Sequence, residues 1–466
     1  MNSNKKMSLV SFFAITASMV MTVYEYPTFA TSKMNLVFYL LVGGFLWFVP
    51  VALCSAEMAT VQGWENGGLY TWVSKTLGRK WGFAAIFFQW FQITVGFITM
   101  IYFIIGALSY VLNWPALNTN VWIKLIATLI IFWLITISQF SGTKNTAKIA
   151  KIGFFIGILA TGMFLFILSI IYIIQGNPIK VSFGVNSWIP DFTKINTLVV
   201  FVSFILAYAG IESSASHVKD MKEPGKNYPK AIFILVVSTI ILDTLGGVTI
   251  AATIPQNQLS LNTGVIQAYS YLINHFGGGE WLTRIIAIVI CLGVIAEIAT
   301  WVVGPSIAML EAAKNGLLPK KMSKVNKHNI PINIVLIQGI IVSIWAVVLT
   351  LGGGGANLSF FVAMSLTVCI YLVAYVLLFL SYIKLIKEKD DLTRSYHIPG
   401  SKKMKFSVAI IGLLVSIFAF FISFFPPNDI GYDKGGTYLA ILIISWLIIF
   451  ITPFLLYKAF DEKINK

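Results

Sequence analysis

Long apolar runs recur along almost the whole chain, separated by short polar segments. Each run is long enough to cross the roughly 30 Å hydrocarbon layer of a bilayer as an α-helix. The pattern predicts an all-α integral membrane protein with about twelve transmembrane helices. Their expected positions are near residues 8–31, 35–61, 81–112, 121–140, 149–174, 194–217, 229–254, 281–311, 332–352, 358–386, 404–425 and 436–458. The connections are too short to hold a separate core, so residues 1–466 are expected to form one transmembrane domain.

Two of the predicted spans are interrupted near their middle. In the first, TVYEYPTFAT (22–31) brings Glu25 and Pro27 into an apolar run. In the sixth, AGIESSASH (209–217) brings a glycine, a carboxylate and three serines. The interruptions are five spans apart, and an odd number of spans per repeat forces the second repeat to insert upside down. We therefore predict inverted repeats near residues 8–174 and 194–386, followed by two additional spans near 404–458.

A break in a membrane helix leaves backbone N–H and C=O groups that lipid cannot satisfy. Such a break is tolerated where these groups line a polar cavity and hold a ligand. Half-helix N-termini attract a carboxylate, and exposed carbonyls attract an ammonium group. A zwitterionic amino acid carries both charges, so the paired breaks indicate a secondary transporter of amino acids. For either break alone, a proline kink without a ligand role is the alternative.

The composition agrees with a membrane protein and explains the basic charge. The 466 residues are 58% hydrophobic and 11% charged, whereas soluble domains carry about 25% charged residues. The net charge is +15, and 27 of the 33 Lys and Arg residues fall on one side of the predicted topology. This bias is typical of cytoplasmic loops. We expect a multi-pass protein of the cell (inner or plasma) membrane with both termini cytoplasmic, and no nucleic-acid partner.

No cofactor or metal site is expected from the cysteines. Cys54, Cys291 and Cys369 all fall inside apolar spans, which indicates neither a disulfide framework nor a cysteine-rich metal site.

Four short motifs resemble the amino acid–polyamine–organocation transporter superfamily, in order along most of the chain. They are AEMATVQGWENGGLYTW (56–72), KEPGKNYPKAI (222–232), KNGLLPKKMSKVNKHNIP (314–331) and YHIPG (396–400). Each motif is weakly specific alone, and the four together are strongly specific. The resemblance implies the fold of five-plus-five inverted repeats with broken helices 1 and 6.

Within that superfamily the chain resembles the bacterial glutamate/γ-aminobutyrate antiporters over nearly its full length. The stretches that carry this resemblance are FFAITASMVMTVYEYPTFATS, GTKNTAKIAKIGFF, GIESSASHV and GVIAEIATWVVGPS. The resemblance implies exchange of external glutamate for internal γ-aminobutyrate as part of acid resistance. It also implies a functional link to a cytoplasmic glutamate decarboxylase, which makes γ-aminobutyrate.

The chain departs from the family pattern in two places. Val20, Met21 and Thr22 stand where the superfamily usually has a Gly-Ser-Gly break, which implies a different pose for the substrate carboxylate. Relatives can also carry a long hydrophilic tail that occludes the cytoplasmic mouth. Here only AFDEKINK follows the last span, so closure by a tail is not expected.

Five carboxylates lie within or near the spans, with no Lys or Arg deep in a span to neutralise them: Glu25, Glu57, Glu212, Asp243 and Glu297. Intramembrane carboxylates are costly and mark a transport pathway by default. Glu57, at a helix end within the span 2 motif, is expected to be structural. For Asp243 a structural and a functional role stay equally open. Glu25 and Glu212 fall in the two breaks, where they could line a site or bond orphan backbone N–H groups.

Aromatic residues at helical spacing complete the predicted pathway. Glu297 and Trp301 are four apart and so share a helix face, as do Tyr371 and Tyr375. With Tyr24 they could surround a substrate ammonium group, although packing is the alternative. The predicted substrate pathway comprises Tyr24, Glu25, Gly210, Glu212, Glu297, Trp301, Tyr371 and Tyr375. His217, at the end of the second break, is a candidate for pH gating or an ordinary interfacial residue.

Two other functions compete with the antiporter. One is a proton-coupled symporter or exchanger for another amino acid or a polyamine. The other is a membrane-embedded enzyme, which would need a nucleophile–base pair or metal ligands. The four histidines, His217, His275, His328 and His397, lie in separate segments. The sequence therefore favours a transporter over an enzyme.

Overall fold

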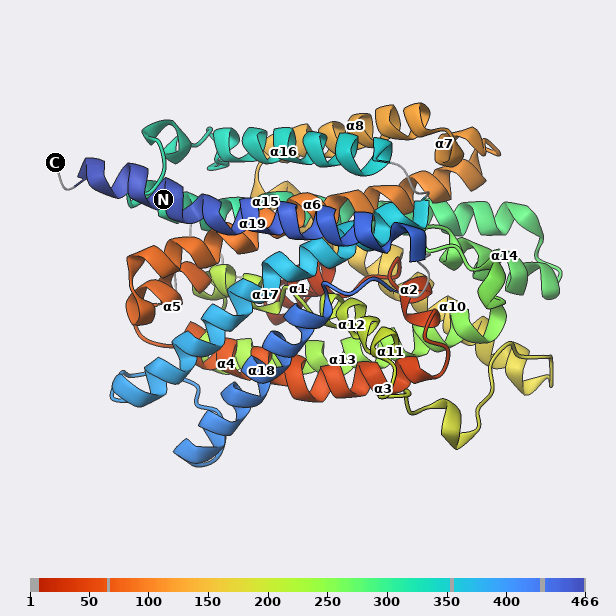
Figure 1. The fold of residues 1–466 in the computed structure, drawn as a ribbon, viewed down its shortest axis with the longest axis horizontal. Helices are drawn as coiled ribbons and strands as arrows, with labels where there is room; N and C mark the ends of the chain where they lie inside the picture. Colours follow the sequence, from red (N-terminus) through yellow and green to blue (C-terminus); the bar gives the residue numbers. More distant parts are fainter. Residues whose placement is uncertain (1–7, 65–67, 353–355, 428–431, 465–466) are drawn as a thin grey trace.

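α-Helices account for nearly all of the chain in the computed structural model, which describes residues 8–64, 68–352, 356–427 and 432–464. Within these ranges the structure contains no β-strand, only an isolated bridge between Val61 and Arg394. Figure 1 shows the long helices running side by side in a layered bundle.

The described elements are named in chain order, with α for α-helices and η for 3₁₀- and π-helices. They are α1 (Leu9–Val20), α2 (Tyr26–Ala30), α3 (Asn35–Gly43), η1 (Gly44–Phe48), α4 (Val49–Ala59), α5 (Gly68–Leu77), α6 (Arg79–Val111), α7 (Ala116–Thr119), α8 (Val121–Ser138), η2 (Gln139–Ser141), α9 (Thr143–Ile152), η3 (Gly153–Ala160), α10 (Thr161–Ile174), η4 (Val185–Ser187), α11 (Ile195–Val199), α12 (Phe201–Ala207), η5 (Ile211–Asp220), α13 (Pro224–Thr253), η6 (Gln256–Gln258), α14 (Gly264–His275), α15 (Gly279–Lys314), η7 (Lys320–Ser323), α16 (Ile332–Leu351), α17 (Ala356–Glu388), α18 (Lys402–Ile422) and α19 (Tyr432–Ile464).

Twelve spans can be traced through these elements. Eleven helical segments of the described chain are long and apolar enough to cross a membrane. The shorter apolar helix α1, together with α2, forms the first predicted span. The predicted all-α membrane fold of about twelve spans is therefore confirmed. The division into inverted repeats stays a prediction.

The core of the bundle is formed by α6, α15 and α17. The most apolar windows of α6 and α17 are 89% buried, and that of α15 is 72% buried. The corresponding window of α19 is only 17% buried, and those of α8 and α18 are 33% buried. Many apolar side chains on these outer helices are exposed among the described residues, so they are placed to face lipid.

The first span is interrupted, as the sequence predicts, and not merely kinked. α1 ends at Val20, α2 begins at Tyr26, and residues 21–25 between them are not helical. Pro27 is the second residue of α2, where the N–H that proline lacks has no helical partner in any case. The proline therefore starts the second half of the span, and Glu25 stands immediately before it.

The sixth span is interrupted as well. Its α-helical part ends with α12 at Ala207, and the chain continues as the 3₁₀-helix η5 from Ile211. Between them Gly210 adopts a φ of 114°, a left-handed conformation that residues with a Cβ rarely reach. The glycine of the motif thus allows the chain to turn between the two halves.

The polar connections separate into two ends of the bundle. In Figure 1 the loops around α5, between α15 and α16 and between α17 and α18 lie at the left end, together with the end of α19. α7 and α14 lie at the right end. The left-hand loops are those in which the sequence concentrates its lysines.

Candidate functional site

A cavity of about 30 Å³ lies where the two breaks meet the central helices. It is bounded by span 1 around its break, the end of α12, and the middle parts of α6, α15 and α17. Its polar lining residues are Thr22, Tyr24, Glu25, Gln92, Thr99, Glu297, Trp301, Thr367 and Tyr371. Segments from both predicted repeats therefore build one polar cavity within the membrane.

Glu25 and Glu297 give the cavity its charge. Both side chains are almost fully buried, at 6% and 2% exposure. The Oε2 atom of each has no hydrogen-bond partner among the described residues, and neither forms an ion pair there. A buried carboxyl without a cation is costly when ionised. The pair is therefore suited to hold either protons or the ammonium group of a ligand.

Aromatic and neutral polar groups surround this carboxyl pair. The rings of Tyr24, Trp301 and Tyr371 line the cavity, and such faces attract an ammonium group. Gln92 and the threonine hydroxyls supply hydrogen bonds for a carboxyl group. The cavity can thus contact both ends of an amino acid.

Trp301 connects the two breaks. Its indole N–H donates a hydrogen bond of 3.1 Å to the carbonyl oxygen of Met19, in the last turn of α1. A Cβ built on Gly210 would lie only 2.8 Å from the same ring. Trp301 therefore satisfies a carbonyl that the first break leaves without a helical partner, and it packs directly against the second break.

Glu212 is held by hydrogen bonds instead of lining the cavity. The Gln89 side-chain amide donates to its Oε1 at 2.7 Å, and the Tyr371 hydroxyl donates to the same atom. The Tyr375 hydroxyl donates to Oε2 at 2.6 Å. Both oxygens of this carboxylate are therefore satisfied, whereas Oε2 of Glu25 and Oε2 of Glu297 have no partner among the described residues.

Tyr375 extends this hydrogen-bond network to the backbone of the break in span 6. Its hydroxyl accepts a 2.7 Å hydrogen bond from the N–H of Gly210 while it donates to Glu212. This arrangement satisfies an N–H group at the break through a tyrosine, whereas the sequence suggested a carboxylate in that role. Glu212, Tyr375 and Gly210 together form a structural support behind the cavity.

The predicted pathway residues thus divide into two groups. Those that line the cavity are Tyr24, Glu25, Glu297, Trp301 and Tyr371, and those behind it are Gly210, Glu212 and Tyr375. Sequence reasoning missed the contributions of Gln89, Gln92 and Thr99 from α6 and of Thr367 from α17. A polar stripe at helical spacing inside an otherwise apolar span was the available signal.

Three other titratable residues lie outside this cavity. Asp243 on α13 is buried, and its Oδ2 has no hydrogen-bond partner among the described residues. Glu57 is held in a network of cations at the end of α4. The side chain of His217 lies outside the part of the structure that is described, so its predicted gating role has no structural test.

The volume of the cavity indicates a closed state. A cavity of about 30 Å³ is far smaller than the roughly 300–1,000 Å³ of typical small-molecule pockets. An amino acid needs more room, so the helices around the breaks must move apart before it can enter. Movement of gates around a fixed site is how alternating access works in transporters with broken helices.

The chain matches the family model described as amino acid permease over residues 7–449. Among its relatives, the glutamate/γ-aminobutyrate antiporter of Lactococcus lactis subsp. lactis (strain IL1403) is 57% identical over 462 residues, covering 99% of this chain and 92% of the relative. The antiporter of the same name from Lactococcus lactis subsp. cremoris (strain MG1363) has the same identity and coverage. An uncharacterized transporter of Legionella pneumophila is 32% identical, covering 100% of this chain and 99% of the relative.

Proposed function

The chain belongs to the amino acid permease family, and we propose that it is a secondary-active antiporter that exchanges external glutamate for internal γ-aminobutyrate. As a member of this family it is a membrane transporter and not an enzyme. The substrates are those named for two relatives that match 99% of this chain.

The cavity between the two breaks carries the proposal. It places two buried carboxyl groups, Glu25 and Glu297, beside three aromatic rings, and neither carboxyl group pairs with a cation within the described parts of the chain. Glutamate and γ-aminobutyrate both have an ammonium group at one end and a carboxyl group at the other. The ammonium group binds at Glu297 and the rings, and the carboxyl group binds at the break of span 1 and Gln92.

The charge of the cavity favours substrates that carry few negative charges. Glutamate with its side chain protonated is a net-neutral zwitterion, which passes buried carboxyl groups at a lower cost than the anion does. γ-Aminobutyrate leaves as a cation, so each complete cycle of glutamate uptake, decarboxylation and export removes one proton from the cell. Coupled to a cytoplasmic glutamate decarboxylase, the cycle contributes to acid resistance.

The orientation follows from the lysines. Both termini and the lysine-rich loops at one end of the bundle are cytoplasmic. The two breaks then lie between an external mouth near α14 and a cytoplasmic mouth near α5 (Figure 1).

Counterflow tests the proposed exchange. Proteoliposomes loaded with γ-aminobutyrate should accumulate radiolabelled glutamate at least about tenfold above empty vesicles at about pH 5.5, because an antiporter needs a substrate on the opposite side. Vesicles loaded with agmatine or with leucine serve as controls. Equal uptake into empty and loaded vesicles would indicate a symporter, and counterflow with agmatine alone would indicate a polyamine exchanger.

A further inference from the structure

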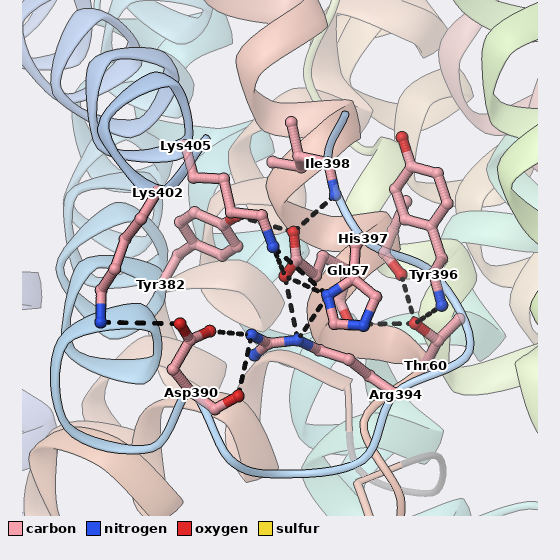
Figure 2. A network of polar contacts seen from close by, with 11 residues as sticks. Glu57, Thr60, Tyr382, Asp390, Arg394, Tyr396, His397, Ile398, Lys402 and Lys405 are labelled. Atoms are coloured by element: carbon pink, nitrogen blue, oxygen red, sulfur yellow. Dashed lines mark hydrogen bonds and ion pairs between the residues drawn. The ribbon is translucent and has the colours of Figure 1, made fainter. Parts of the chain in front are cut away.

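A second cluster of charges lies far from the cavity, at the end of α4. Glu57 is completely buried at 0% exposure, and it is paired with two cations. Arg394 Nε lies 3.0 Å and Lys405 Nζ 2.7 Å from its Oε1. Figure 2 shows that the two cations approach this carboxylate from the loop before α18 and from the first turn of α18.

The other oxygen of Glu57 is bound by two neutral donors. The Tyr382 hydroxyl, from α17, donates at 2.8 Å, and the backbone N–H of Ile398 donates at 2.7 Å. One carboxylate of span 2 thereby joins α17, α18 and the loop between them. The loop is also bonded to the end of span 2 through its backbone, since Gln62 N–H donates to the Thr393 carbonyl at 2.9 Å.

His397 enters this cluster as a hydrogen-bond acceptor. Its Nδ1 lies 3.2 Å from Arg394 Nε and 3.3 Å from Lys405 Nζ. Two of the three charged neighbours of Nδ1 are cations that can only donate, and the third, Glu57 Oε1, lies farther away at 3.5 Å. A neutral ring with its lone pair on Nδ1 therefore fits this position best. Histidine is the side chain whose charge ordinarily changes between about pH 5 and 8. The ring is also half exposed, at 54%, so protons reach it.

The remaining titratable groups around the cluster keep their charge in that range. Asp390 pairs with Arg394 and with Lys402, 3.5 Å away. Burial raises the pKa of Asp390, but its hydrogen bond to Arg394 and the surrounding cations lower it more, so that it stays ionised.

The neighbouring phenols stay neutral. Burial and the charge of Glu57 raise the pKa of Tyr396 above its usual value, and Tyr382 acts as a neutral donor. Cys54, one turn before Glu57, is a buried thiol. His397 is therefore the member of this cluster whose residue type ordinarily changes charge between about pH 5 and 8.

We propose that Glu57, Arg394, His397 and Lys405 form a proton-sensitive latch that holds span 2 against the loop between spans 10 and 11. At neutral pH the neutral imidazole accepts from both cations and supports their contacts with Glu57. Protonation removes the lone pair at Nδ1 and places a third cation beside Arg394 and Lys405. The latch is therefore intact while the imidazole is neutral and weakens when the imidazole is protonated.

The position of the latch in the membrane suggests its role. This step rests on the proposed function, in which both termini and the lysine-rich loops are cytoplasmic. The latch then lies at the cytoplasmic mouth. A falling cytoplasmic pH opens the latch and frees span 2, which carries on directly from the broken span 1. Proton load inside the cell thus activates the exchange that removes protons.

A distance measurement on the full-length protein tests the latch without any transport. Spin labels on Gln62→Cys and Lys403→Cys, both at exposed positions, report the separation of span 2 from α18. The three native cysteines are buried. Between about pH 7.5 and 5.5 the population at longer distance should grow several-fold. His397→Asn keeps an acceptor and cannot be protonated, so its distance distribution should stay unchanged at both pH values.

A permanent positive charge at position 397 should have the opposite effect to His397→Asn and should open the latch at every pH. His397→Lys should show the long-distance population already at about pH 7.5, whereas the control His328→Asn, in another exposed loop, should behave as the unmodified protein does. An equal pH response in His397→Asn, or a short distance at both pH values in His397→Lys, would overturn the latch. Because the readout needs neither substrate nor sidedness, these outcomes do not depend on whether the chain exchanges glutamate for γ-aminobutyrate.

Discussion

Replacing Glu297 with glutamine should flatten the pH dependence of exchange. In the unmodified protein, transport should be greatest in acid and fall by up to about a hundredfold for each pH unit towards neutrality, because Glu297 and the side chain of glutamate each contribute up to about tenfold. The reason is that Glu297 is buried beside Glu25. A substrate with a carboxyl group passes Glu297 at a low energetic cost only while Glu297 is protonated. The glutamine variant is neutral at every pH, so its remaining pH dependence should come from the protonation of glutamate alone, and its fall between about pH 5.5 and 7 should be at least several-fold smaller than that of the unmodified protein.

Two variants provide the comparison. Glu311→Gln removes an exposed carboxylate from the same helix, one that pairs with Lys314 at 3.0 Å, and should leave the profile unchanged. His217→Asn tests gating by the histidine of the second break. An unchanged profile in Glu297→Gln together with a shifted one in His217→Asn would reject titration of the cavity and favour gating.

Replacing Glu57 with glutamine should cost the protein about 3–5 kcal/mol of stability, the usual loss when one partner of a buried ion pair is removed. The substitution keeps the shape of the side chain but leaves Lys405 and Arg394 as uncompensated charges. The Arg394 side chain is only 1% exposed, so water cannot compensate for the loss. Denaturant unfolding in detergent micelles should report a correspondingly lower midpoint.

Solvent-exposed pairs at the same end of the molecule should behave differently. Glu388 pairs with Lys384 at 3.7 Å, with both side chains more than one third exposed. Glu388→Gln should therefore change the unfolding free energy by less than about 1 kcal/mol. Adding Lys405→Met to Glu57→Gln should recover part of the loss, because it removes one buried charge. If Glu57→Gln lowered the unfolding free energy by as little as Glu388→Gln does, the result would contradict a buried latch.

Local sequence patterns predicted the breaks correctly, and they indicated several of the residues that line the cavity. Proline and glycine have backbone requirements that show in the sequence, so Pro27 and Gly210 marked the interruptions that the structure confirms. Glu297 and Trp301, four residues apart, do face one cavity. Apolar length alone predicted the number of spans.

Local sequence patterns could not predict contacts between segments that are distant in the sequence. Tyr371 and Tyr375 have the spacing of Glu297 and Trp301, yet only Tyr371 lines the cavity, while Tyr375 supports Glu212. Spacing shows that two residues share a helix face, but not which partner that face meets. The sequence likewise suggested a structural role for Glu57 without indicating its cations, which come from beyond span 10.

The central claim is that the breaks of spans 1 and 6 form one cavity that holds both substrates. Thr22→Cys and Ala209→Cys place a thiol on the cavity side of each break. Ala209 is preferable to Gly210, where a Cβ would strike Trp301. A membrane-permeant maleimide should label both positions, and glutamate and γ-aminobutyrate should each slow labelling at both by at least about fivefold, with leucine ineffective. Protection at only one position, or by only one of the two substrates, would contradict a shared site.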